Sequence, residues 1–196
     1  MQAKYITKLN PYSRLLVLLI AAGIGVVIYF AVTSLKQSPH SIVYISAPNN
    51  FKVTLPKKPT ITHPPTGTTK AGTKETVTFF NVSTNTTEYS IFAGKYAGKN
   101  FNTEQPAALK KELEGYVVSF ADSQKSYLKS PVIGTFNGLI AAQATLTPQS
   151  STAHVSGIYV TAFGNGNELY LVVASNITRT AYTNYLKSFQ FLKPLS

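Results

Sequence analysis

The clearest candidate for a reactive pair is Ser126 and Lys129, which are spaced as in the S-x-x-K motif. On a helix this spacing places a lysine amine one turn from a serine nucleophile, as in the penicillin-recognising enzymes. Here the pair lies where a predicted helix gives way to a predicted strand, and the companion S-D-N motif is absent. A serine hydrolase using Ser126 and Lys129 is therefore the alternative function, not the favoured one.

Other reactive side chains are few and scattered. The carboxylates are Glu75, Glu88, Glu104, Glu112, Glu114, Asp122 and Glu168. Two of them, Glu112 and Glu114, cannot share one face of a helix, so they do not form the facing pair that glycoside cleavage needs. The histidines, His40, His63 and His154, lack a paired metal-ligand spacing, and cysteine is absent. We predict no catalytic, cofactor-binding or metal site.

The chain is basic, with a formal net charge of +11. Such a charge attracts anionic lipid headgroups, acidic polymers or nucleic acid. Arginine, which binds phosphate in a bidentate manner, occurs only at Arg14 and Arg179. We therefore expect no specific nucleic-acid binding, and we expect the early lysines to be solvated. These lysines are Lys52, Lys57, Lys58, Lys70 and Lys74.

An uncharged apolar run extends from Leu15 to Leu35. At about 1.5 Å per helical residue, it is long enough to cross the roughly 30 Å hydrocarbon core of a bilayer. The tail 1–14 carries basic residues and no acid, which places it in the cytoplasm by the positive-inside rule. We expect a single-pass protein of the cell membrane, with residues 36–41 as a linker and residues 42–196 as one extracytoplasmic domain.

This run has one alternative interpretation, and it also contains a helix-contact motif. A cleaved signal peptide also has a basic start, but its apolar core is shorter, and no clear A-x-A site follows here. Retention in the membrane is the favoured interpretation. Within the run, Ala21 and Gly25 have the spacing that lets two helices approach closely, which allows a weak homodimer.

The sequence after the linker predicts a series of strands interrupted by two helices. Alternating or β-branched apolar residues predict strands over 42–46, 51–55, 76–82, 88–96, 127–136, 139–147, 155–163 and 168–174. Helical spacing of apolar residues predicts helices around 109–120 and 182–189, with Asn102 or Thr103 capping the first and Thr178 the second. The Pro/Thr-rich stretch 56–74 is expected to be an exposed loop.

Turn residues fix several of the expected connections. Asn137-Gly138 is a strong two-residue hairpin signal, and the segment 164–167 predicts another hairpin. Tyrosines are frequent, and Tyr159, Tyr170 and Tyr182 are candidates to line a groove, although packing in a sheet explains most tyrosines. The expected fold class is α+β, an antiparallel sheet with helices between strand groups and at the end.

This order and several segments resemble the PsbP-like family of α/β/α sandwich domains. The segments are the strand 51–56 ending at Pro56, the strand 138–142, the strand 167–173 and the closing segment 185–191 with its Ser-Phe-x-Phe turn. The resemblance covers most of residues 42–193 and implies an antiparallel sheet sandwiched by helices. Bacterial members of the family are often tethered, exported proteins, and the resemblance transfers no ligand residue to this chain.

Together these observations favour a binding function over catalysis. We expect a membrane-tethered, extracytoplasmic binding or assembly module that contacts membrane lipid through residues 15–35. Its partner is expected to be an envelope protein, an anionic polymer or a lipid surface.

Overall fold

The computed structural model describes residues 41–64, 66–68, 74–148 and 157–193. The predicted tail 1–14, the apolar run 15–35 with Ala21 and Gly25, and the linker up to residue 40 lie outside the described residues. Among the residues that are described, no helix has the length and apolar character needed to cross a membrane.

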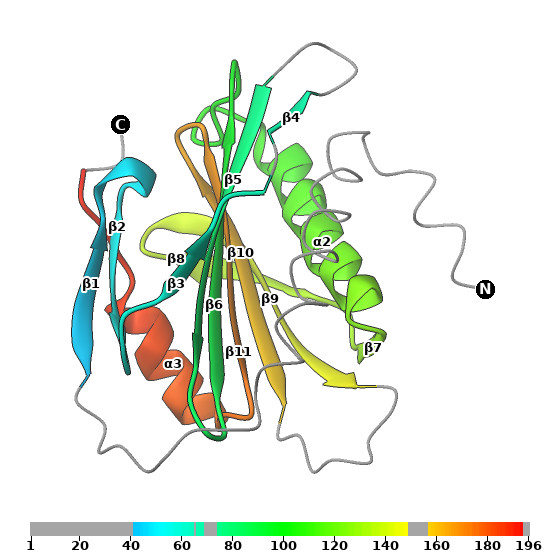
Figure 1. Cartoon of the computed structure of the whole chain (residues 1–196). Helices are drawn as coiled ribbons and strands as arrows, with labels where there is room; N and C mark the ends of the chain where they lie inside the picture. The colour runs from blue at the N-terminus through cyan, green and yellow to red at the C-terminus, as the bar shows by residue number, and fades with distance from the viewer. Residues whose placement is uncertain (1–40, 65, 69–73, 149–156, 194–196) are drawn as a thin grey trace.

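The centre of the fold is a large antiparallel sheet, in which the strand order is β3-β5-β6-β11-β10-β9-β7 (Figure 1). Strand β4 also pairs with β5, and β8 also pairs with β9. The strands are β3 (Thr60–Thr62), β4 (Gly67–Thr68), β5 (Lys74–Ser83), β6 (Glu88–Tyr96), β7 (Ser126–Leu128), β8 (Val132–Phe136), β9 (Leu139–Pro148), β10 (Ile158–Asn165) and β11 (Glu168–Ser175).

A second, small sheet has the order β1-β2-β12 and lies beside α3 (Figure 1). Its strands are β1 (Ile42–Ser46), β2 (Phe51–Leu55) and β12 (Gln190–Phe191). The short 3₁₀ helix η3 (Ala47–Asn49) joins β1 to β2, and Asn50 follows it in the left-handed region at φ 49°. Asparagine tolerates such a left-handed backbone, which allows the tight connection.

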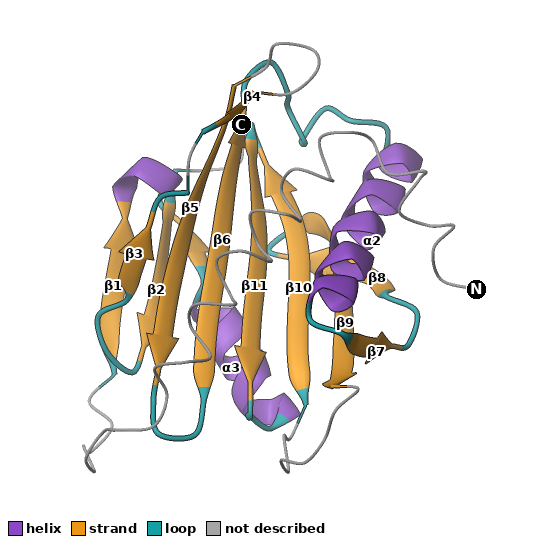
Figure 2. Ribbon diagram, turned by 45° about the vertical axis from the view of Figure 1, so that its right-hand side comes forward, coloured by secondary structure: helices purple, strands orange, loops and turns teal. Residues whose placement is uncertain are grey.

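Two helices cover opposite faces of the large sheet (Figure 2). Helix α2 (Pro106–Ser123) buries its apolar side, including Leu113, Val117 and Phe120, against one face. Helix α3 (Arg179–Ser188) packs with the small sheet against the other face, where Phe51, Phe163, Tyr170 and Phe189 form an aromatic cluster. The expected α+β class with helices on both sides of an antiparallel sheet is confirmed.

The structure differs from the predicted elements in three places, the simplest of which is the short closing strand β12, which was not predicted. The strand predicted over 127–136 is divided into β7 and β8 around Pro131, because proline has no N–H to donate to a strand ladder. The stretch 56–74, predicted to be a loop, contains the short strands β3 and β4, which both pair with β5. Such brief pairings need no apolar alternation, so the sequence pattern did not reveal them.

Local signals at the helix ends and turns were partly correct. The Thr178 side chain caps α3 by accepting a hydrogen bond from the Ala181 N–H at 3.2 Å, as predicted. Asn137 and Gly138 both have positive φ, as a two-residue hairpin turn requires. The cap predicted for α2 was wrong, because its N-cap is Gln105, which makes no side-chain cap bond.

Candidate functional site

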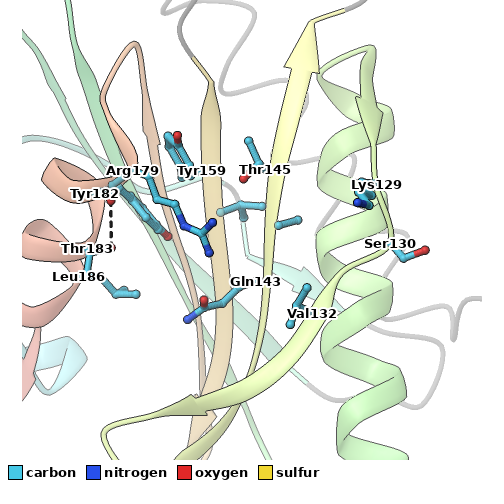
Figure 3. Close-up of a pocket in the computed structure, with 12 residues that line it drawn as sticks. Lys129, Ser130, Val132, Gln143, Thr145, Tyr159, Arg179, Tyr182, Thr183 and Leu186 are labelled. Carbon is cyan, nitrogen blue, oxygen red and sulfur yellow. Dashed lines mark hydrogen bonds between the residues drawn. The ribbon is translucent and has the colours of Figure 1, made fainter.

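A groove of about 410 Å³ opens beside helix α3 (Figure 3). Its walls come from α3, strands β9 and β10, and the segment that joins β7 to β8. The side chains that define its chemistry are Lys129, Gln143, Thr145, Tyr159 and Arg179. We interpret this groove as a candidate binding site.

The charge on this groove is entirely positive. Lys129 and Arg179 are its charged residues, and no aspartate or glutamate lines it. None of the ion pairs formed within the described part of the chain involves either residue. Both cations are therefore available to a ligand, and the groove attracts anions.

The position of Arg179 follows from the capping of α3. Thr178 ends the extended chain and Arg179 is the first helical residue, from which its guanidinium extends toward Gln143 (Figure 3). The Thr183 hydroxyl donates to the Arg179 carbonyl oxygen at 2.9 Å and holds this first turn. Arginine presents a planar set of donors that matches phosphate or carboxylate oxygens.

Tyr159 and Tyr182 form the aromatic wall of the groove. Their rings are stacked, with centroids 5.2 Å apart and planes inclined by 19°. The buried Tyr182 hydroxyl lies 2.7 Å from the Thr161 hydroxyl and donates to the Val172 carbonyl oxygen at 3.1 Å. Burial raises the pKa of Tyr182, so its phenol stays protonated and serves to position Tyr159.

The structure does not place the Ser126–Lys129 pair on a helix. Ser126 is 6% exposed on strand β7, where its hydroxyl donates to the Gln124 carbonyl oxygen at 3.3 Å. Lys129 follows the strand and lines the groove, whereas Ser126 does not. The helical spacing that would bring the amine to the hydroxyl is absent, since both residues lie outside α2.

The other residues considered from sequence lie in separate places. Among the tyrosines expected at a groove, Tyr159 and Tyr182 line it and Tyr170 does not. His63 lies 3.4 Å from the Thr78 hydroxyl through Nδ1, while His40 and His154 fall outside the described residues. The part of the chain that the structure describes holds no group of three or more metal-ligating side chains.

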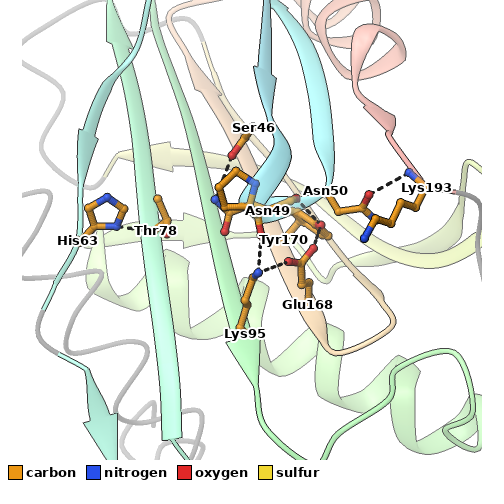
Figure 4. A network of polar contacts seen from close by, with 10 residues as sticks. Ser46, Asn49, Asn50, His63, Thr78, Lys95, Glu168, Tyr170 and Lys193 are labelled. Atoms are coloured by element: carbon orange, nitrogen blue, oxygen red, sulfur yellow. Dashed lines mark hydrogen bonds and ion pairs between the residues drawn. The ribbon is translucent and has the colours of Figure 1, made fainter.

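Glu168 belongs to a buried polar cluster at the turn between β1 and β2 (Figure 4). Its carboxylate pairs with Lys95 at 3.2 Å, and Lys95 also donates to the Pro48 carbonyl oxygen. The Tyr170 hydroxyl donates to Glu168 or to the Asn49 carbonyl oxygen 2.8 Å away. Burial and the neighbouring carboxylate raise the pKa of Tyr170, and the cluster ties the small sheet to the large one.

A second buried cluster lies between β5, β6 and α2. The Tyr116 hydroxyl is 3.3 Å from both the Tyr96 hydroxyl and the Glu112 carboxylate, which in turn pairs with Lys99. Glu75 faces Tyr96 across the strand pair, and neither of its carboxylate oxygens has a hydrogen-bond partner among the described residues. Burial raises the pKa of Glu75, and the nearby Tyr96 hydroxyl partly offsets that shift.

The groove residues that sequence reasoning did not assign to a site are Arg179, Gln143 and Thr145. They come from helix α3 and strand β9, and no spacing along the chain connects them with Lys129. A usable signal was Arg179 itself, because the arginine guanidinium matches the geometry of phosphate and carboxylate oxygens.

Comparison with known proteins supports the fold alone. No protein-family model and no curated protein matches the chain. The solution structure of cyanobacterial PsbP (CyanoP) from Synechocystis sp. PCC 6803 is similar, with 9% sequence identity and a TM-score of 0.50. The match covers 82% of this chain and 98% of that chain. The described domain therefore has a PsbP-like fold.

Proposed function

We propose that this protein is a membrane-tethered, extracytoplasmic binding module without a catalytic site, and that its groove binds an anionic polymer of the cell envelope. The observation that carries the proposal is the charge of the groove. Lys129 and Arg179 are its charged residues, and no carboxylate lines it.

The rest of the lining suits a repeating anionic unit. Gln143 and Thr145 supply neutral donors and acceptors, and Tyr159 offers a flat apolar surface. A stable protein partner would instead need roughly 800 Å² of contact on each side, so we favour a polymer over an envelope protein.

The tether rests on the N-terminal sequence. The apolar run 15–35 has the length of a membrane-spanning helix, and the basic tail 1–14 favours a cytoplasmic N-terminus. Residues 42–196 then lie outside the cytoplasm. There the domain meets the envelope polymers that carry phosphate or carboxylate groups.

The groove is tested by titrating the full chain in detergent with polyphosphate, used as a model polyanion. Replacing both groove cations, Lys129→Gln with Arg179→Gln, should weaken binding by at least about tenfold, because charge-assisted contacts are the strong ones. The control Lys110→Gln with Lys111→Gln removes the same charge from exposed positions on α2. Equal losses in the two double variants would mean that only net charge matters and would contradict the groove.

The tether is tested separately on membranes. The chain should resist extraction by alkaline carbonate, and protease added outside the cell should remove the domain. Recovery of a shortened, freely soluble form would instead indicate a cleaved signal peptide.

A further inference from the structure

Strand β1 exposes apolar side chains on the outer face of the small sheet. Val43 is 65% exposed and Ile45 is 58% exposed. Between them Tyr44 points inward, with its ring centroid 5.8 Å from that of Phe80. Among the described strands β1 pairs only with β2, so it also forms an edge of its sheet. Exposed apolar groups of this kind mark an interaction surface.

Basic side chains surround these apolar ones. Lys52 pairs directly with Ile45 across the two strands. Lys57 and Lys58 are exposed just after Leu55, which pairs with Ile42 at the beginning of β1. The first acidic residue of the whole chain is Glu75, so no carboxylate from β1, β2 or their connections neutralises this surface. We call Val43, Ile45, Lys52, Lys57 and Lys58 the β1 patch.

The length of the chain places the β1 patch near the membrane, given the tether of the proposed function. Residues 36–41 separate the apolar run from β1. Six residues span at most about 20 Å even when fully extended. Lys57 and Lys58 follow β2 at the end of the β1–β2 hairpin where β1 begins, because Leu55 pairs with Ile42.

We propose that the β1 patch lies on the bilayer surface and binds anionic lipid headgroups. Its exposed valine and isoleucine contact the interfacial region, and its lysines pair with lipid phosphates. Anionic lipids attract basic segments close to a membrane helix in this way. Bilayer contact would also orient the domain, because α2 lies on the side of the molecule away from β1 (Figure 1).

The absence of tryptophan from the chain permits a direct test. The full chain carrying Val43→Trp is reconstituted into vesicles of phosphatidylcholine and phosphatidylglycerol, with bromines on the lipid acyl chains. We expect the emission of this single tryptophan to shift to the blue and to be quenched by at least about half. The matched control is Tyr127→Trp, where the native side chain is 61% exposed on β7, which lies on the side of the molecule away from β1 (Figure 1). Its emission should stay that of a residue in water.

A second comparison tests the lysines. Adding Lys57→Glu with Lys58→Glu to the Val43→Trp chain should reduce the quenching in anionic vesicles and change it little in pure phosphatidylcholine. The control Lys110→Glu with Lys111→Glu, on exposed positions of α2, should leave the quenching unchanged. Equal effects of the two double variants would overturn the role of the patch lysines.

The outcomes separate this inference from the proposed function. A carbonate-resistant chain whose Val43→Trp emission matches that of Tyr127→Trp would overturn the bilayer contact and leave the tether intact. A blue shift without bromine quenching would mean that a second protein chain covers β1, which also overturns it. Release of the chain by carbonate would overturn the tether of the proposed function and, with it, the bilayer contact.

Discussion

Tyr159 and Tyr182 stack at 5.2 Å between ring centroids and thereby join strand β10 to helix α3 at the groove. Tyr182 is buried, and its hydroxyl is held by Thr161 and by the Val172 carbonyl oxygen. Tyr159 is half-buried and presents its ring to the groove. The groove is therefore built on side chains that the core keeps in place, which reduces the entropy lost when a ligand binds.

Removing the Tyr182 hydroxyl should destabilise the domain. Tyr182→Phe leaves the buried Thr161 hydroxyl without this partner, and we expect a loss of about 1–3 kcal/mol in unfolding free energy. Urea denaturation followed by circular dichroism measures the loss. Tyr127→Phe is the control because Tyr127 is largely exposed, and it should change stability by less than about 0.5 kcal/mol. Similar values for the two variants would contradict the role of the buried hydroxyl.

The cap of α3 should contribute to stability in a measurable way. Thr178→Ala removes the side-chain acceptor of the Ala181 N–H, and we expect a loss of about 1 kcal/mol by chemical denaturation. The control is Thr180→Ala, two residues further on, which changes an exposed helical residue. It should have no destabilising effect, since alanine favours helices. An unchanged unfolding free energy in Thr178→Ala would show that the cap does not contribute to stability.

A close approach between two segments should forbid a side chain at Gly164. A Cβ added there would lie 2.4 Å from the Phe101 ring, whose own position is set by the Phe101 N–H donating to the Gly166 carbonyl oxygen at 2.6 Å. We expect Gly164→Ala to cost about 1–3 kcal/mol or more through overpacking. Gly134→Ala is the control, since no atom lies within 4 Å of the added Cβ. Thermal unfolding should give a clearly lower Tm for Gly164→Ala than for Gly134→Ala.

The buried Glu75 carboxyl should make stability depend on pH. Glu75 is 1% exposed, and burial raises its pKa above the ordinary value of 4.5. The folded state therefore holds this proton at pH values where the unfolded chain has lost it, so stability falls as pH rises from about 4.5 through the folded-state pKa.

Glu75→Gln removes this contribution. The unfolding free energy of the variant relative to the original chain should rise with pH in that window, by at most about 1.4 kcal/mol per pH unit. Below pH 4 the difference should be constant. Denaturation curves at several pH values measure it, and a difference independent of pH would show that Glu75 titrates normally.

Ser126 should not react with a fluorophosphonate probe. Its hydroxyl is buried on β7 and donates to the Gln124 carbonyl oxygen, and Lys129 extends into the groove instead. We expect no labelling of the purified chain, and mass spectrometry of its peptides checks this. Labelling at Ser126 that disappears in Ser126→Ala would establish the hydrolase alternative and end the proposal of a purely binding function.

Local physics made much of the fold predictable from sequence. The alternation in residues 51–55 reflects a strand with one buried face, and the spacing of Leu109, Leu113 and Phe120 reflects a helix with one buried side. The turn at Asn137-Gly138 and the cap at Thr178 depend on the backbone preferences and hydrogen bonds of residues that are neighbours in the chain. Such signals depend on a few neighbouring residues, so they can be recognised without knowledge of the tertiary structure.

The candidate site depended on contacts that no local signal describes. Lys129 and Arg179 line one groove because β7 pairs with β9, β9 pairs with β10, and α3 packs onto the same sheet. Likewise β12 joins β2 through the pair Phe191 and Phe51, which are far apart in the sequence, near the start and the end of the domain.

The sequence by itself determined most of the longer elements, their order, the apolar run and the basic charge, because each arises from residue type and short-range periodicity. The tertiary structure alone decided which cations share a groove and which apolar side chains of β1 remain exposed. The physical reason is that long-range pairing is selected by the packing of the whole core, a sum over distant residues that no single stretch of sequence contains.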